Sequence, residues 1–353
     1  MALFEVTAND KRIYEEELWD FLPEKMLDVH CHIWRLGEDK RRNQRKAGEA
    51  TRTVSWPSMV ASHNPIEDLQ ETYELLFPGK DCSSLLMANS GPSEIGNRYV
   101  AECAAKLGWG GLYFSGPWQS ADEVEQEIRA GGFVGIKSYL DLSPKYLPVA
   151  EIRIFDFFPK HQLERLNEMG GIVMLHIPRN GRLKDPINHA QILEIKREFP
   201  NIRLIIAHIG RAYVKEDVGN SFEVLGAAPD LMYDFAANCC EYAITEAIRN
   251  VGPKHLMFGL DLPILRMRTH RIEENGTYIN LIPPGLYGDP SQDPHLREVS
   301  AEEAEKITFF AYEELLAFKR ACITLGCSRQ DVEDMMYNNA ASLIEAARKS
   351  IYG

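Results

Sequence analysis

Short apolar runs recur along the chain and alternate with longer stretches whose apolar residues have helical spacing. This alternation is typical of successive β-α units and predicts a parallel sheet. The runs number eight, and eight parallel strands close a (β/α)₈ TIM barrel. The predicted strands cover 26–30, 84–87, 111–114, 133–137, 172–176, 203–208, 231–235 and 256–261. For the second and third, a buried helical segment is the alternative.

Helical patterns separate several of these runs. The clearest cover 120–130, 159–169 and 188–199, and a glycine or proline, which stops a helix, follows each one. Near the carboxyl end, Ser300 and Glu303 have the spacing of a capping box, which predicts a long helix to about Leu325, and Ser328 begins another. We therefore expect a helical extension over 300–353 that packs around the barrel.

Two stretches exceed what a minimal barrel needs. Residues 34–80 include the charged run 41–46, and residues 262–300 are rich in proline, glycine and arginine. Both follow a predicted strand, so we expect them over the mouth at the carboxyl ends of the strands, where lids and specificity loops lie. An oligomer contact is an equal alternative for the second insertion. The whole chain, 1–353, is predicted to be one barrel domain with these insertions.

The charge and the cysteines narrow the class of protein. The 353 residues include 39 Lys+Arg and 52 Asp+Glu, so the formal net charge is −13, which disfavours binding to nucleic acid or to an anionic membrane. No apolar run reaches the ~18 residues of a membrane-spanning helix, and acidic residues interrupt any export-signal pattern near the start. Seven scattered cysteines without a Cys-x-x-Cys pair predict reduced thiols in a cytoplasmic protein.

Metal-competent side chains stand at the ends of four predicted strands. His30 and His32 end the first strand, and period-two alternation places both on the face that becomes the lumen of a closed barrel. His176, His208 and Asp261 end the fifth, sixth and eighth strands. Barrel enzymes place their catalytic groups at these ends. Converging imidazoles and a carboxylate suit Zn²⁺ or another divalent ion such as Mn²⁺, so we expect a metal site.

The motifs around these residues resemble the amidohydrolase superfamily, specifically the amidohydrolase-related branch that includes aminocarboxymuconate-semialdehyde decarboxylase. The resemblance extends from Met26 to about Asn339. It is carried by Asp-Val-His-Cys-His at 28–32, Val-Met-Leu-His at 173–176, Ile-Ala-His-Ile-Gly at 206–210, Met-Phe-Gly-Leu-Asp-Leu-Pro at 257–263 and Asn-Asn-Ala at 338–340. The metal ligands that this resemblance implies are His30, His32, His176 and Asp261.

The same resemblance implies catalytic roles for two residues. A metal ion lowers the pKa of its water toward neutrality. Asp261 would accept the proton of that water and deliver it to the leaving group, while His208, beside the metal, would polarise the scissile carbonyl or act as acid and base. Leu260 departs from the branch, which commonly has a small hydroxyl residue there, so a known member's substrate does not transfer to this chain.

Lys137 ends the fourth predicted strand, and two functional interpretations of it compete. In binuclear members of the superfamily a lysine at that strand is carboxylated and bridges two metals, and His176 and His208 would then hold the second ion. In the branch that this chain resembles, the lysine is usually not a bridge, and a free ammonium would anchor a substrate carboxylate. We favour one divalent ion and a free Lys137.

Candidate substrate contacts follow the predicted ligands closely. They are Trp34, Arg35, Arg179, Arg182, Arg211 and Tyr213. Loops at these positions overhang the metal, where a guanidinium could grip a carboxylate through two parallel hydrogen bonds, although a solvated rim is the alternative. The second insertion adds Arg266, Arg268, His270 and Arg271, and then Tyr278 and Tyr287. Arginine gathered at the mouth of an acidic protein favours a small anionic substrate.

Together these features predict a metal-dependent hydrolase of an amide, ester or lactone bond in a small carboxylated compound. A non-oxidative decarboxylase of a small carboxylic acid, aromatic acids included, is the alternative, and the motifs do not choose between them. A sugar-acid isomerase ranks below both. A barrel retained only for binding is disfavoured, because a ligand stands at every expected strand end. On base rates we expect a homo-oligomer.

Overall fold

The computed structural model describes residues 2–35, 57–89, 91–291 and 293–353. The charged run 41–46 and much of the first insertion lie outside the described residues. None of the helices in the described part of the chain has the length and apolarity to cross a bilayer.

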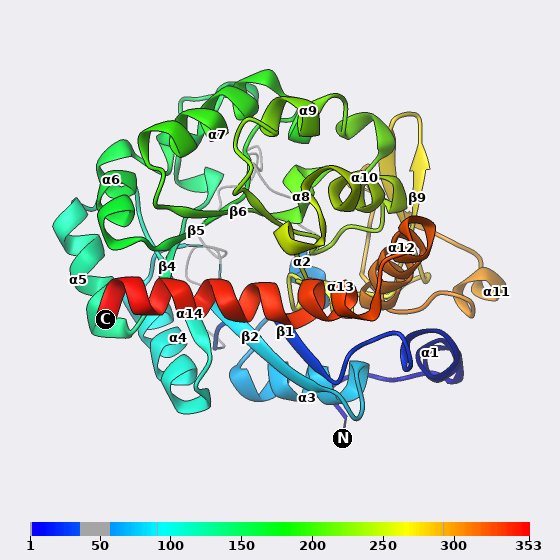
Figure 1. Ribbon diagram of the computed structural model, residues 1–353. Helices are drawn as coiled ribbons and strands as arrows, with labels where there is room; N and C mark the ends of the chain where they lie inside the picture. The colour runs from blue at the N-terminus through cyan, green and yellow to red at the C-terminus, as the bar shows by residue number, and fades with distance from the viewer. Residues whose placement is uncertain (1, 36–56, 90, 292) are drawn as a thin grey trace.

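Eight parallel strands, hydrogen-bonded in chain order from first to last, form the centre of the molecule (Figure 1). The eight predicted strands and the (β/α)₈ TIM barrel are therefore confirmed. The strands are β1 (Lys25–Ile33), β2 (Asp81–Ala88), β3 (Gly110–Phe114), β4 (Gly135–Lys137), β5 (Ile172–Leu175), β6 (Arg203–Ile206), β7 (Met232–Asp234) and β8 (Leu256–Met257).

Helices follow the strands and cover the outside of the barrel (Figure 1). The main ones are α3 (Ile66–Leu76), α4 (Glu94–Leu107), α5 (Ala121–Gly131), α6 (Lys160–Met169), α7 (Pro186–Glu198), α9 (Ser221–Leu225), α10 (Glu241–Val251) and α12 (Phe310–Leu325). Before β1 come α1 (Ala8–Ile13) and a π-helical turn, Tyr14–Leu18. The three helices predicted at 120–130, 159–169 and 188–199 correspond to α5, α6 and α7. Ser120 caps α5 with the reciprocal bonds of a capping box to Glu123.

The lumen of the barrel is filled by apolar side chains. They come from every strand or its flank, and the residues are Leu27, Val29, Leu85, Met87, Leu112, Val134, Ile172, Met174, Ile205, Ala207, Met232 and Met257. The last helix, α14 (Asn339–Tyr352), adds Ala340, Ile344 and Ala347 to this cluster and crosses one end of the barrel (Figure 1). Asn339 fixes that helix, because its amide donates to the carbonyls of Pro253 and Leu256, where β8 begins. The amino ends of the strands are thus covered.

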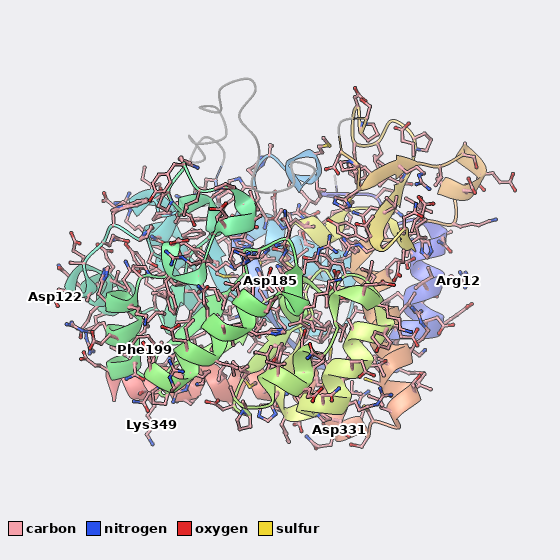
Figure 2. All side chains as sticks on the ribbon, turned by 90° about the horizontal axis from the view of Figure 1, so that it is seen from above. Arg12, Asp122, Asp185, Phe199, Asp331 and Lys349 are labelled. Carbon is pink, nitrogen blue, oxygen red and sulfur yellow. The ribbon has the colours of Figure 1, made fainter. Side chains whose placement is uncertain are left out.

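The second insertion contains a small sheet that the sequence pattern did not reveal. Its strands are β9 (His270–Glu274), β10 (Thr277–Ile282) and β11 (Leu296–Glu298). Figure 2 shows this sheet and α14, near the label Lys349, at opposite edges of the molecule. Arg271 donates to the carbonyl of Ala237 at 2.7 Å, which attaches the sheet to the loop that follows β7. The insertion therefore lies beside the carboxyl ends of the strands.

The helix predicted from Ser300 to Leu325 is interrupted. Ser300 and Glu303 do form the capping box, but it starts only the short α11 (Ala301–Ala304), and α12 begins at Phe310. Between them, the Thr308 hydroxyl donates to the buried Asp10 carboxylate at 2.7 Å and the Thr269 amide donates to the Thr308 carbonyl. Contacts with distant segments thus hold these residues out of a helix. Ser328 caps α13 (Arg329–Glu333), as predicted.

Candidate metal centre

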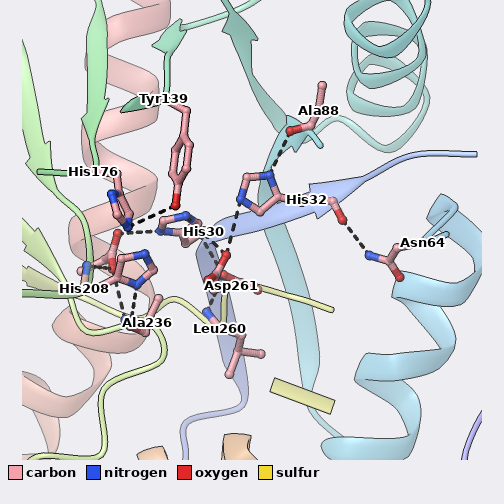
Figure 3. A network of polar contacts seen from close by, with 12 residues as sticks. His30, His32, Asn64, Ala88, Tyr139, His176, His208, Ala236, Leu260 and Asp261 are labelled. Carbon is pink, nitrogen blue, oxygen red and sulfur yellow. Dashed lines mark hydrogen bonds and ion pairs between the residues drawn. The ribbon is translucent and has the colours of Figure 1, made fainter. Parts of the chain in front are cut away.

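A register shift in β1 directs two histidines into the lumen. The pairing of β1 with β2 is irregular between Asp28 and Cys31. Before the shift, Val29 faces the lumen; after it, Cys31 packs in the outer core between barrel and helices. His30 and His32 therefore both project from β1 toward Asp261 (Figure 3). A bulge that re-aims a side chain beside a functional site is a recurrent device in barrels.

His30, His32 and Asp261 form a compact group of donor atoms. The carboxylate Oδ1 of Asp261 lies 3.6 Å from Nε2 of His30 and 3.4 Å from Nε2 of His32. One donor atom from each residue fits within 4.8 Å of the others. Gly259 allows this approach of β8 to β1, because a Cβ there would stand 3.0 Å from the Cβ of His30. The side chains of His32 and Asp261 are 16% and 14% exposed, against 2% for His30, so water reaches the group from their side.

The far nitrogen of each imidazole is occupied. Nδ1 of His30 lies 3.1 Å from Oδ2 of Asp234, and Nδ1 of His32 lies 2.9 Å from the carbonyl of Ala88. Since both partners only accept, each Nδ1 carries the proton and each Nε2 keeps its lone pair toward Asp261. Such outer partners fix the ring orientation of metal-binding histidines. The donor set, two imidazoles and a carboxylate, fits a divalent ion.

Asp234, at the end of β7, was missed in the sequence. Besides His30, its carboxylate accepts hydrogen bonds from the backbone amides of His208 at 2.7 Å and Ala236 at 3.1 Å. It is fully buried, and a second group of possible metal donors combines it with His30 and His208. The available signal was a carboxylate one residue before the end of the apolar run 231–235. Its partners lie on β1 and after β6, and no local pattern pairs them.

His208 begins a left-handed turn. The φ angles of His208, Ile209, Gly210 and Arg211 are 57°, 48°, 61° and 61°. For a residue other than glycine this conformation costs about 1–2 kcal/mol, so the surrounding structure must hold it. The Asn238 amide donates to the carbonyls of His208 and Ala212, and Nδ1 of His208 donates to the Ala236 carbonyl at 2.7 Å.

The ring of His208 stacks on that of His30, with centroids 4.6 Å apart. Burial, followed by the nearby His30, lowers the pKa of His208 to about 4. For Asp261, burial raises the pKa, but the imidazoles of His30, His32 and His208 outweigh it and hold the pKa below its ordinary value. At neutral pH the site therefore contains a neutral imidazole beside an ionised carboxylate.

His176 lies beside His208, and in Figure 3 both lie on the other side of His30 from His32. Its ring centroid is 5.3 Å from that of His208, and its Nε2 is 3.5 Å from the Tyr139 hydroxyl. Within the described residues, its buried Nδ1 has no hydrogen-bond partner. Burial, with Arg211 as the next contribution, lowers the pKa of His176 well below its ordinary value. His176 is not a member of the compact group of donors, so its role as a ligand stays a prediction.

Lys137 ends β4 inside the barrel. It is 1% exposed, and its Nζ has no hydrogen-bond partner among the described residues and lies 5.9 Å from the centre of the Tyr139 ring. Burial lowers the pKa of Lys137 to about 8, against the opposing effect of Asp261 and Asp234. A buried amine of this kind is ready to pair with an anion that enters the lumen.

Four predicted substrate contacts already have protein partners. Trp34 is buried and donates to the Ser62 carbonyl, and Arg35 stacks on the Tyr99 ring at 4.0 Å. Arg179 pairs with Asp185, the residue that caps α7. One Arg211 nitrogen, Nη1, is 3.3 Å from each of three carbonyls, those of Ile177, Pro178 and Arg179. These contacts hold the loops after the strands, and substrate binding by the four residues stays a prediction.

Arg182 and Tyr213 belong to a cluster that the second insertion completes. The Tyr213 ring is 6.4 Å from that of His208 and 5.2 Å from that of Tyr278 on β10. Arg182 and Arg271 each lie over both tyrosine rings, at 4.4 to 5.4 Å from the centroids. Asp217 pairs with Arg182 at 2.7 Å. We call these four residues, Arg182, Tyr213, Arg271 and Tyr278, the arginine–tyrosine cluster.

Barrel enzymes place their catalytic groups at the carboxyl ends of the strands, and the imidazoles and the carboxylate of this chain gather there. The chain belongs to the amidohydrolase family, whose model matches residues 27–345. The family resemblance inferred from the motifs, and with it the expectation of an enzyme, is confirmed. No curated protein matches the chain.

Several solved structures share the fold at low sequence identity. A candidate 2-pyrone-4,6-dicarboxylic acid hydrolase from Pseudomonas putida is 16% identical with a TM-score of 0.53, covering 92% of this chain and 98% of its own. A dihydroxybenzoic acid decarboxylase from Polaromonas sp. JS666, with bound manganese and 2-nitroresorcinol, is 14% identical, with a TM-score of 0.54 and coverage of 94% and 100%. An amidohydrolase from Burkholderia multivorans with bound zinc is 11% identical, with a TM-score of 0.56 and coverage of 91% and 99%.

Proposed function

We propose that the protein is a metal-dependent hydrolase of an amide, ester or lactone bond in a small carboxylated substrate. The observation that carries this proposal is the compact group of His30, His32 and Asp261 at the carboxyl ends of β1 and β8. Both Nε2 atoms have free lone pairs, and the carboxylate is ionised between them. These residues, with His176 as a fourth ligand, would hold one divalent ion, which we propose to be zinc, with manganese as the alternative.

When bound, the ion would act as a Lewis acid on a substrate oxygen and make water more acidic. Asp261 would take a proton from the attacking water at Oδ2 and return it to the leaving group. His208, neutral because its pKa is about 4, would orient the scissile carbonyl through Nε2, since Nδ1 is engaged by Ala236. General acid–base groups contribute about 10²- to 10⁴-fold to a rate, so Asp261→Asn should lose at least 100-fold.

The positive groups inside the mouth support a carboxylated substrate. Lys137, whose Nζ has no hydrogen-bond partner in the described part of the chain, would bind one carboxylate near the metal ligands. Arg182 and Arg271 of the arginine–tyrosine cluster would bind a second anionic group farther out, beside His208. The structural relatives named as acting on a pyrone dicarboxylate and on dihydroxybenzoate support small carboxylated substrates as a class.

Decarboxylation of a small carboxylic acid is the second candidate. It is supported by the manganese-containing dihydroxybenzoic acid decarboxylase of the same fold. The same group of ligands would orient the carboxylate, and product identity separates the two reactions. Release of CO₂ marks decarboxylation, while a cleaved or ring-opened acid marks hydrolysis.

Metal content is the first test. Protein purified without chelator is analysed by elemental mass spectrometry, beside His30→Ala, Lys137→Ala and the control His255→Ala, whose histidine lies before β8 at the other end of the barrel. We expect about one equivalent in the wild type, the control and the Lys137 variant, and a loss in the His30 variant. Two equivalents, with one lost in Lys137→Ala, would replace this scheme with a carboxylated-lysine bridge. No metal, even after reconstitution with zinc or manganese, would refute the proposal.

A further inference from the structure

The barrel closes between β1 and β8 with few main-chain hydrogen bonds. β8 comprises only Leu256–Met257, and the chain beyond it runs beside β1. Two main-chain bonds join these segments: the Val29 amide donates to the Phe258 carbonyl, and the His32 amide donates to the Leu262 carbonyl, each at 3.0 Å. The amides of His30 and Leu260 lie between these two bonds, at the point where the register of β1 shifts.

Asp28 occupies this gap with its side chain. Its Oδ1 accepts the His30 amide at 2.9 Å and the Leu260 amide at 3.0 Å. One carboxylate oxygen therefore joins the two strands where a backbone carbonyl would otherwise be needed, because a buried amide without an acceptor is costly. The other oxygen, Oδ2, accepts the hydroxyl of Tyr73 at 2.9 Å, and that hydroxyl also contacts Ser84. Asp28 is 1% exposed, so water does not compete for these bonds.

The two amides that Asp28 joins belong to the candidate metal centre. One is the amide of His30 itself, and the other belongs to Leu260, the residue before Asp261. Asp261 has a φ of 50°, and the peptide between Gly259 and Leu260, which Asp28 holds through the Leu260 amide, lies one residue before the peptide that carries Asp261. Tyr73 lies on α3. Its hydrogen bond to Oδ2 therefore connects the outer helical layer to the Asp28 carboxylate.

We infer that Asp28 is a positioning residue that sets the separation of His30 and Asp261 by joining their backbones across the β1–β8 seam. Asp28 does not touch the metal in this scheme; it acts through the backbone amide of His30 and through that of Leu260, the residue before Asp261. The inference rests on the proposed metal site. Outer partners of ligands typically alter metal affinity by about 10- to 100-fold when they are removed, and an acceptor shared by two ligand backbones should act on both.

Two substitutions of Asp28 distinguish its role as a hydrogen-bond acceptor from the effect of its charge. In Asp28→Asn, the amide oxygen can still accept both backbone amides while the new NH₂ donates toward Tyr73 and Ser84. In Asp28→Ala, both amides lose their acceptor. The matched controls are Asp10→Asn and Asp10→Ala, because Asp10 is also a fully buried carboxylate with several donors but lies on α1, outside the barrel.

The test measures zinc affinity by competition with a chromophoric chelator, and amide hydrogen exchange of the metal-free proteins. We expect Asp28→Ala to bind zinc about 10- to 100-fold more weakly and to exchange faster in peptides containing His30 and Leu260. Asp28→Asn should remain within about threefold of the wild type, since it keeps the acceptor. Both Asp10 variants should retain the wild-type affinity, whatever their stability.

Each outcome decides a separate point. If the wild type binds zinc and a folded Asp28→Ala binds it equally well, the positioning role is refuted while the proposed function stands. If no protein binds zinc or manganese, the proposed function fails, and unchanged exchange in Asp28→Ala would then refute the seam as well. If Asp28→Ala does not fold, Tyr73→Phe, which removes the donor to Oδ2, decides: weaker zinc binding supports the inference, and wild-type affinity overturns it.

Discussion

Gly210, third in the left-handed turn after β6, allows a sharp test of how the site is held. A Cβ at this position would be 2.6 Å from Cδ1 of Leu183 and 3.3 Å from Cδ1 of Ile177, and the φ of 61° is unfavourable for alanine. The conformational penalty is about 1–2 kcal/mol, and forcing a methyl group into a packed site adds about 1–3 kcal/mol. Gly210→Ala should therefore lower the free energy of unfolding by about 2–5 kcal/mol.

Gly108 provides the control, because the two penalties separate there. Its φ is 69°, but a Cβ would meet no atom within 4 Å. Gly108→Ala should therefore lose only the conformational part, about 1–2 kcal/mol. Urea denaturation of both variants measures the difference, and a double-mutant cycle with Leu183→Ala should remove the steric part from Gly210→Ala. Equal losses for the two glycines, or no coupling to Leu183, would refute the reasoning that packing against Leu183 holds this turn.

Three further outcomes follow from the site and its surroundings. Asp234→Asn replaces an acceptor with an NH₂ facing Nδ1 of His30, which favours the tautomer with a protonated Nε2; zinc affinity, measured by chelator competition, should fall about 10- to 100-fold, and an unchanged affinity would contradict the assigned tautomer. Dialysis against a chelator should lower the midpoint of thermal unfolding and zinc should restore it, because an ion that binds only the folded state stabilises it; equal midpoints with and without zinc would argue against the site. Burial raises the pKa of Asp10, but its bonds with Arg268, Thr308 and Thr7 outweigh burial and hold the pKa below its ordinary value. The stability advantage of the wild type over Asp10→Asn should therefore be full at neutral pH and shrink below about pH 4. An advantage that does not vary between pH 7 and 3 in urea denaturation would exclude this linkage.

The positions of the barrel strands, and the polar residues at their ends, could be predicted from the sequence because the strands are buried on both faces. Strands buried on both faces read as short apolar runs, so a polar residue at the end of one, such as His176 or Asp261, is conspicuous. Closure of the barrel then brings those ends together without further information. Period-two alternation placed His30 and His32 on one face correctly, but the bulge after Asp28 determines that this face is the lumen, and no local pattern marked it.

The remaining features depend on contacts between distant segments. Asp28 and Asp234 each accept one backbone amide two residues ahead and one from a distant segment, that of Leu260 or His208. The distant partner is in place only after the barrel closes. The break before α12 follows from Thr308, whose hydroxyl binds Asp10 from nearly the whole length of the chain away. The sheet of the second insertion has strands of three to six residues, and two of them, β9 and β11, are mostly charged and at least partly exposed. They therefore form no apolar runs that stand out within a proline- and glycine-rich stretch. Such features are set by tertiary contacts that override local preference.

The position of helix α14 determines the route by which substrate enters the barrel and product leaves it. It covers the amino ends of the strands, and the lumen between it and the ligands is filled with leucine, methionine and isoleucine side chains. Within the described residues the barrel is therefore closed at the amino ends of its strands, and a molecule that enters past His32 and Asp261 must leave by the same opening. A product carrying the carboxylate of its substrate would compete for the same positive groups on its way out. In a barrel with one opening, product release would limit the turnover rate as readily as the chemical step.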